Sequence, residues 1–215
     1  MLKTIKYKIL DNPNFYNLSQ RIISRYGGTT KYFIKKCVLP LSPKSILELG
    51  CGTGNCLYDL PENIEYTGID ISSDYVKSAK NKFRSRGRFL LGSVLDFDFS
   101  KLGKFDLVLA HGFFHHVNNA TIMAYLEHVE PSLTNDSNLL SIDPCFVEKQ
   151  NIISHFIVSN DRGKYVRSEK EYTKLLKKFY SEIKSVIRDD LLVFPYHTCI
   201  LSCQGRNFNI KSEKF

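Results

Sequence analysis

The chain has 215 residues, of which 43% are hydrophobic and 13% aromatic, and its formal net charge is +8. This length and composition predict one folded domain with a sizeable core and argue against extensive disorder. No run approaches the roughly 20 apolar residues of a membrane helix, and the basic start MLKTIKYKIL is not followed by the apolar stretch of a signal peptide. We therefore expect a cytoplasmic protein without membrane insertion.

The positive charge is spread along the chain, with modest concentrations at 77–88 and 164–178. This distribution is typical of solvated helix faces, although a basic balance also fits an anionic partner such as nucleic acid. The six cysteines show no paired metal-ligand spacing. They are interpreted as small buried hydrophobic residues, and no metal site is expected.

Strand-like and helical patterns alternate along the chain, beginning with predicted helices at 14–26 and 29–38. Such alternation predicts a doubly wound, Rossmann-like α/β fold with a mostly parallel, seven-stranded sheet and helices on both faces. The later elements are strands at 45–49, 64–70, 88–94, 105–110 and 138–143, a short helix stopped near Pro61, a helix capped by Ser72 or Ser73, a helix containing Ile122 and Val129, a helix begun by the capping box SEKE (168–171), and two strands within 183–204.

The stretch ILELGCGTGN (46–55) places three glycines directly behind the first predicted strand. Clustered glycines at a strand end indicate a sharp turn or the close approach of a ligand. The dinucleotide pattern G-x-G-x-x-G fails here, because its third glycine position is Asn55. Glu48 would also repel a pyrophosphate, whereas it suits a ligand that carries an ammonium or sulfonium group.

Asp70 ends the second predicted strand, twenty residues after Gly50. A carboxylate at this position can accept hydrogen bonds from both hydroxyls of a ribose. In parallel sheets ligands bind at the carboxyl ends of the strands, which is where both motifs fall. Together they predict an adenosine-type ligand without obligatory phosphates.

The stretches ILELGCGTG, YTGIDIS and FDLVLAHGFFHHV together resemble the class I S-adenosylmethionine-dependent methyltransferases. More narrowly, the chain is similar to small bacterial methyltransferases with DPCF after the fifth strand and an NDRGKYVR-like stretch beyond it. The resemblance covers roughly 12–204. It implies a single methyltransferase domain over 1–215, with a helical cap at 1–42, a cofactor-binding core at 43–145, an acceptor-side half at 146–204 and a tail at 205–215.

The resemblance also implies S-adenosylmethionine as cofactor and assigns the residues that bind it. The first strand and its glycine loop would hold the methionine moiety and ribose, and the ends of the next strands would hold ribose, adenine and the methyl-donor side. Many relatives have an acid where this chain has Ser93, and Asp96 is a candidate substitute. The implied cofactor residues are Glu48, Gly50, Cys51, Gly52, Asp70, Ile71, Ser93, Val94, Ala110 and His111.

Methyl transfer needs alignment of donor and acceptor, and a base when the acceptor is a hydroxyl. The candidate catalytic residues are His111, His115 and Asp143, with His116 interpreted as structural; capping of a following helix is the alternative for Asp143 and for one of the adjacent histidines. The candidate acceptor-binding residues are Arg162, Tyr165 and Arg167 in NDRGKYVR, Tyr196 and His197 in PYHT, and Tyr16 in the N-terminal helix, which also carries Gln20 and Arg25.

We therefore predict a methyltransferase that acts on an oxygen of a small molecule, such as a sugar or a precursor of a secondary or cell-surface metabolite. A nucleic-acid methyltransferase is disfavoured, because no Asn/Asp-Pro-Pro-aromatic tetrapeptide follows the fourth strand and no basic stripe carries interleaved aromatics. A non-catalytic cofactor-binding protein remains a second alternative. Asn55 and Glu48 disfavour an NAD-dependent oxidoreductase. Acceptor and oligomeric state are left open.

Overall fold

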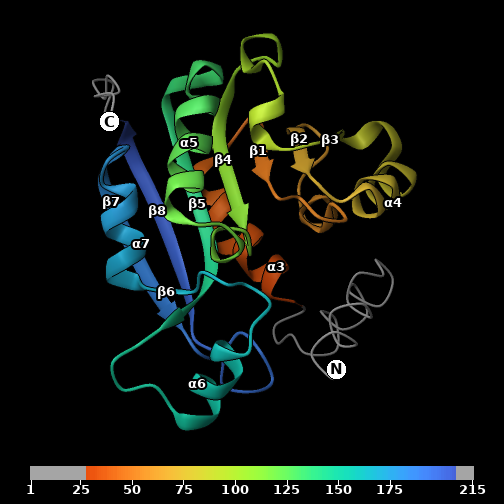
Figure 1. Ribbon diagram of the computed structural model, residues 1–215. Helices are drawn as coiled ribbons and strands as arrows, with labels where there is room; N and C mark the ends of the chain where they lie inside the picture. Colours follow the sequence, from red (N-terminus) through yellow and green to blue (C-terminus); the bar gives the residue numbers. More distant parts are fainter. Residues whose placement is uncertain (1–27, 207–215) are drawn as a thin grey trace.

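In the computed structural model, which describes residues 28–206, the strands form one central sheet with helices on both faces (Figure 1). The strands are β1 (Ser45–Leu49), β2 (Glu65–Asp70), β3 (Arg88–Leu91), β4 (Phe105–His111), β5 (Leu133–Phe146), β7 (Tyr180–Arg188) and β8 (Thr198–Arg206), with the two-residue β6 (Arg167–Ser168) paired to β5. The helices are α3 (Thr29–Phe33), α4 (Ser73–Phe83), α5 (Asn119–Val129), α6 (Ile152–Ser159) and α7 (Glu169–Leu176).

The order of the strands across the sheet is β3-β2-β1-β4-β5-β8-β7. The first five strands along the chain run parallel, whereas β8 is antiparallel to both of its neighbours, β5 and β7. Strand order reverses between β1 and β4, which creates the kind of edge where doubly wound folds bind ligands. The predicted doubly wound, mostly parallel fold is confirmed.

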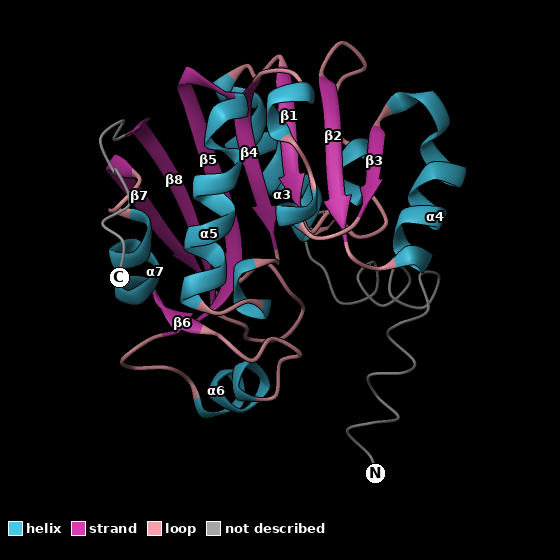
Figure 2. Cartoon of the chain, turned by 45° about the horizontal axis from the view of Figure 1, so that its top comes forward, coloured by secondary structure: helices cyan, strands magenta, loops and turns pink. Residues whose placement is uncertain are grey.

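Successive residues of the central strands face the two sides of the sheet. On β4, Val108 and Ala110 pack with α5 and α7, whereas Leu107 and Leu109 pack with α3 and α4. Figure 2 shows α5 and α7 together on one side of the sheet. Because both faces are covered, the strands are continuous apolar runs, as is typical of buried parallel sheets.

Side-chain caps begin several helices where the sequence predicts them. The Ser72 hydroxyl accepts a hydrogen bond from the Tyr75 amide at the start of α4. Ser168 and Glu171 form the reciprocal capping box of α7. Such caps satisfy amide groups that have no partner within the helix, so they fix where each helix begins.

Several predicted bounds differ from the structure. The helix expected at 29–38 is α-helical only to Phe33 and continues as a π-turn, β3 ends at Leu91 rather than 94, and β5 spans 133–146 rather than 138–143. Helix α6 was not predicted, because its run of β-branched and apolar residues shows no helical period.

The predicted helix at 14–26 and residues 207–215 of the predicted tail lie outside the described residues. Within 28–206, no helix is both long and apolar enough to cross a membrane.

Candidate active site

The loop between β1 and the following turn is built from glycines in left-handed backbone conformations. Gly50, Gly52 and Gly54 have φ of 69°, 54° and 73°, values that side-chain-bearing residues rarely adopt. A Cβ at Gly50 would lie 2.2 Å from the ring of Phe113, which follows β4. The glycine loop is therefore packed directly against the β4–α5 connection, and a larger residue at Gly50 would separate the two.

Asp70 lies at the end of β2 and is bound by the backbone on both sides. Its Oδ2 accepts from the Gly52 amide and its Oδ1 from the Ser72 amide, each at 2.8 Å. Each oxygen retains a lone pair for another donor. Burial raises the pKa of this carboxyl above its ordinary value. The neighbouring Ile71 is 76% exposed, which leaves a large apolar surface beside the carboxylate.

Glu48 is buried within the protein rather than exposed at the mouth of the loop, with only 2% of its surface accessible. Its carboxylate accepts hydrogen bonds from the Cys56 thiol at 3.2 Å and from the Tyr66 hydroxyl. Burial raises the pKa of Glu48 to about 7, against the opposing effect of these two hydrogen bonds. Near neutral pH the group is therefore divided between its protonated and ionised forms.

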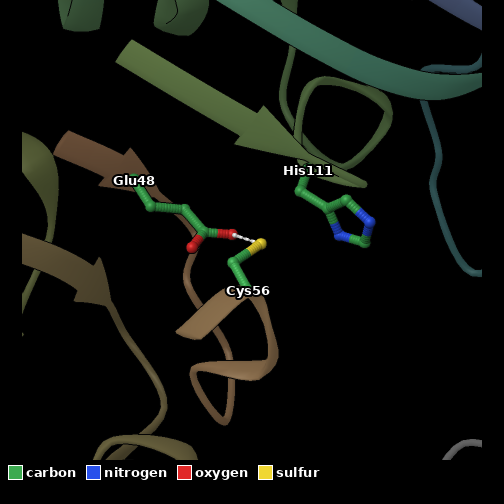
Figure 3. Close-up of side chains that lie close together, drawn as sticks. All are labelled: Glu48, Cys56 and His111. Carbon is green, nitrogen blue, oxygen red and sulfur yellow. Dashed lines mark hydrogen bonds between the residues drawn. The ribbon is translucent and has the colours of Figure 1, made fainter. Parts of the chain in front are cut away.

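His111 lies close to this pair, so that atoms of Glu48, Cys56 and His111 fall within 4.8 Å of one another (Figure 3). These residue types could ligate a metal ion, a grouping that sequence spacing did not reveal. A thiol must lose its proton to bind metal. Burial and the nearby Glu48 raise the pKa of Cys56 well above its ordinary value, so this arrangement favours a hydrogen-bonded thiol.

Four further residues assigned to the cofactor lie near the same loops. Val94 and Ala110 are buried and Cys51 is packed against Gly68, so they offer backbone atoms rather than side chains to a ligand. The Ser93 hydroxyl lies 3.3 Å from the Tyr125 hydroxyl and caps the turn that follows β3. Asp96 contributes to this cap as well, since its Oδ2 accepts the Ser93 amide at 2.6 Å.

The two histidines proposed as bases lie in opposite electrostatic environments. His111 ends β4, with its Nε2 3.3 Å from the Thr30 hydroxyl, and burial lowers its pKa to about 4. His115 has a carboxylate at each ring nitrogen: Asp143 lies 2.7 Å from Nδ1 and Asp161 lies 3.3 Å from Nε2. Burial opposes the charge of His115, but these hydrogen bonds outweigh it and raise the pKa to about 9. At neutral pH His111 can accept a proton and His115 cannot.

Asp143 does not cap a helix, because it lies within β5. It accepts both the backbone amide of His115 at 3.2 Å and its ring nitrogen. His116 stacks on His115 with ring centroids 4.0 Å apart. Burial and the positive charge of His115 lower the pKa of His116 to about 4. The Oδ1 atom of Asp143 is therefore already bonded to His115 within the protein and not directed at a substrate.

Arg167 was expected to bind the acceptor, but its side chain is 6% exposed and points into the protein. Its guanidinium donates to the backbone carbonyls of Phe114, Val117 and Tyr165 at 2.7–2.9 Å and to the side chain of Asn119 at 2.7 Å. These bonds explain why an arginine occupies this position. They tie the start of α7 to the β4–α5 connection.

The remaining acceptor candidates divide between inward and outward positions. The Tyr196 hydroxyl donates to Asp161 at 2.7 Å, and His197 Nδ1 lies 2.7 Å from the Ser154 hydroxyl on α6. Tyr165 is exposed and Arg162 half-buried. Tyr16 lies outside the described residues. Asp161 and Asn119, which sequence reasoning did not select, emerge as the partners of His115 and Arg167.

Comparison with known proteins shows which families and structures the chain is similar to. Residues 47–139 match the model of a family described as a methyltransferase domain. A demethylmenaquinone methyltransferase of Lactococcus lactis subsp. lactis is 36% identical over 76 residues, which cover 32% of this chain and 30% of that protein. The matched regions span between 30% and 57% of the lengths of the curated relatives.

Solved structures show the same fold. The plantazolicin methyltransferase BpumL, in complex with a triazolic desmethylPZN analog and SAH, aligns with a TM-score of 0.62 at 18% identity, covering 95% of this chain and 96% of that one. The mitomycin 7-O-methyltransferase MmcR aligns with a TM-score of 0.60 at 17% identity, covering 76% and 50%. The match of residues 47–139 to the methyltransferase-domain model and the shared fold confirm the resemblance to the class I S-adenosylmethionine-dependent methyltransferases.

Replacing Arg167 by Met should destabilise the fold, because it leaves three backbone carbonyls without their charged donor. We expect the free energy of unfolding in urea to fall by about 3 kcal/mol or more. Arg88→Met, at an exposed position of β3, serves as the control and should change it by no more than about 0.5 kcal/mol. Equal stability of Arg167→Met and the native chain would contradict the structural role.

Proposed function

We propose that the chain transfers the methyl group of S-adenosylmethionine to an oxygen atom of a small molecule. The observation that carries this proposal is the Asp70 carboxylate, which is fixed by the Gly52 and Ser72 amides at the carboxyl end of β2, beside the loop that follows β1. Two lone pairs beside a glycine-lined loop fit the paired hydroxyls of a ribose. The exposed Ile71 side chain next to them suits one face of an adenine ring.

The methionine end of the donor would lie along the glycine loop toward Glu48. The donor carries an ammonium and a sulfonium group, and a nearby cation favours the ionised form of a carboxyl group. Burial raises the pKa of Glu48 to about 7. In this arrangement the cationic end of the donor would lie next to its carboxylate and stabilise the ionised form. The glycines keep side chains away from the path of the ligand, and Phe113 holds the loop in place.

On the acceptor side, His111 is the residue we assign as base. The acceptor oxygen attacks the methyl carbon, the C–O bond forms as the S–CH₃ bond breaks, and the electron pair of that bond stays on sulfur as a neutral thioether. The acceptor hydroxyl loses its proton to an imidazole nitrogen of His111, which is neutral at physiological pH. A weak base suffices, because an oxygen bearing both a proton and a new methyl group is a far stronger acid than an imidazolium.

This proposal keeps the division of the chain expected from the sequence. Gly205 and Arg206 of the expected tail belong to β8 instead. Residues 43–145 would bind the donor, 146–204 would shape the acceptor side, and the described part of 1–42 would cover the site. Thr30, at the start of α3, supports the last assignment, since its hydroxyl contacts His111 directly. The names of two solved structures with this fold, the plantazolicin and mitomycin 7-O-methyltransferases, support a small-molecule or peptide acceptor.

Asp70→Ala should weaken the binding of S-adenosylhomocysteine at least about tenfold, because two charge-assisted hydrogen bonds to the ribose are lost. Isothermal titration calorimetry on native and variant chains measures this change. Asp74→Ala, an exposed acid in the first turn of α4, is the matched control and should bind normally. Binding of NAD without binding of S-adenosylhomocysteine by the native chain would refute the methyltransferase proposal.

The affinity for S-adenosylhomocysteine should rise between pH 6 and pH 8. Glu48 has a pKa of about 7, so its ionised form, which attracts the ligand's ammonium, becomes dominant over this interval. We expect the dissociation constant to fall about five- to tenfold. Glu48→Gln should remove most of this dependence, whereas Glu127→Gln on the exposed side of α5 should retain it. A flat native profile would show that Glu48 does not face the ammonium.

His111→Ala should slow turnover more than tenfold and leave the affinity for S-adenosylhomocysteine within about threefold. The assay follows labelled methyl groups from S-adenosylmethionine onto a panel of phenols, sugars and hydroxylated peptides. His128→Ala, near the opposite end of α5 from the site, controls for the loss of a histidine ring. Unchanged turnover in His111→Ala would remove this residue as the base.

A further inference from the structure

Four side chains from four segments form one hydrogen-bonded chain next to the proposed acceptor site. Asp143 from β5 bonds to His115 Nδ1 at 2.7 Å, and His115 Nε2 lies 3.3 Å from Asp161, which follows α6. Tyr196, just before β8, donates to the other oxygen of Asp161 at 2.7 Å. We call Asp143, His115, Asp161 and Tyr196 the His115 clamp. Methyl transfer as proposed above uses none of these contacts directly.

The segment 160–166 is folded closely around His115. A Cβ on Gly163 would lie 2.1 Å from the His115 ring and 2.5 Å from its backbone oxygen, so only glycine fits there. The Tyr165 amide donates to the His115 carbonyl at 2.9 Å, and the Gly163 amide donates to Asp161 at 2.8 Å. Arg167 fastens the far end of the same segment to the carbonyls of Phe114 and Val117.

The two carboxylates determine the state of the ring between them. A carboxylate at each nitrogen is satisfied only when both nitrogens carry a proton, which is the imidazolium form. The charge is largely removed from solvent, since His115 is 6% exposed and Asp143 is 2% exposed, so each attraction is stronger than at a surface. The other titratable or charged groups around the ring are His111, His116, Arg162 and Arg167.

We propose that Asp161 is a positioning residue of the acceptor side: it completes a two-carboxylate clamp on the His115 imidazolium and thereby fixes residues 160–166 over the end of β4. The role in acceptor binding rests on the proposed methyl transfer, whereas the clamp itself does not. Asp161 acts through His115 and the segment that it holds. Loss of its charge is therefore expected to alter acceptor binding and to leave donor binding intact.

The first measurement uses the native chain. In protein labelled with ¹⁵N and ¹³C at histidine, with the His115 signals assigned from His115→Gln, His115 should remain doubly protonated at pH 8 and titrate near pH 9. This value is expected because the hydrogen bonds to the two carboxylates raise the pKa of His115 by more than burial lowers it. A His115 midpoint near 6.5, or a single neutral tautomer at pH 7, would overturn the proposal.

The second measurement uses Asp161→Asn, which keeps an oxygen for the Gly163 amide, places an amide N–H that can donate to the Tyr196 hydroxyl in place of the second oxygen, and removes the charge. The His115 midpoint should fall by at least about one pH unit, and the Gly163 and Tyr165 amides should exchange with deuterium about tenfold faster. Asp98→Asn, an exposed acid paired with Lys101, should change neither. An unchanged midpoint and unchanged exchange in Asp161→Asn would overturn the clamp.

The third measurement separates this proposal from the proposed function. Asp161→Asn should bind S-adenosylhomocysteine within about twofold of the native affinity. It should also raise the KM of any acceptor found in the panel at least about fivefold. A normal acceptor KM in Asp161→Asn would overturn the acceptor-positioning role. If the native chain fails to bind S-adenosylhomocysteine, the proposed methyl transfer fails, while the His115 titration still tests the clamp.

Discussion

The carboxyl edge of the sheet depends on charged side chains that bind the backbone of its loops. Loops that converge at a switch point have many amide and carbonyl groups outside the strand ladder, and buried backbone groups must find partners. Asp70 accepts the amides of Gly52 and Ser72, and Asp143 accepts the amide of His115. Arg167 donates to three carbonyls. These charged side chains therefore fix the shape of the loops through contacts within the protein alone.

The same edge uses charge in two different ways. On the donor side, the buried carboxyl of Glu48 is bonded by neutral donors only, the Tyr66 hydroxyl and the Cys56 thiol. On the acceptor side, the carboxylates of Asp143 and Asp161 face a cationic ring within the protein. His111 and His115, four residues apart in one short segment, are therefore held in opposite protonation states. Their surroundings, and not their residue type, set these different protonation states.

The sequence predicted the features that depend on local patterns. The period of apolar residues placed β1, β2 and β4, and the positions of Ser72 and Ser168 placed two helix starts. The glycine loop and Asp70 were found because a strand-end glycine cluster and a strand-end acid each carry a local signal. Helix α6 lacked such a signal, since its eight residues are mostly apolar on every side.

Features that depend on distant contacts could not be predicted in this way. From the sequence, Arg167 beside Tyr165 indicates a ligand-binding residue. Only the contact with the carbonyl of Phe114, 53 residues away, shows that its guanidinium N–H groups bind the backbone instead. Glu48 was assigned to the cofactor, and nothing in the sequence indicated that the Tyr66 hydroxyl on the adjacent β2 would bind its carboxylate within the core. The pairing of His115 with Asp161 likewise joins segments that are 46 positions apart in number but adjacent at the sheet's edge.

These two uses of charge suit an enzyme whose donor is cationic and whose acceptor is neutral. A carboxyl group with a pKa of about 7 gains its charge when a cation arrives, so the donor side favours a positively charged ligand. The acceptor side cancels much of its own charge internally, because the His115 imidazolium neutralises one of its two carboxylates. In the proposed transfer, a neutral hydroxyl next to the neutral His111 would meet a base without a strong competing charge, an environment that suits methyl transfer to oxygen.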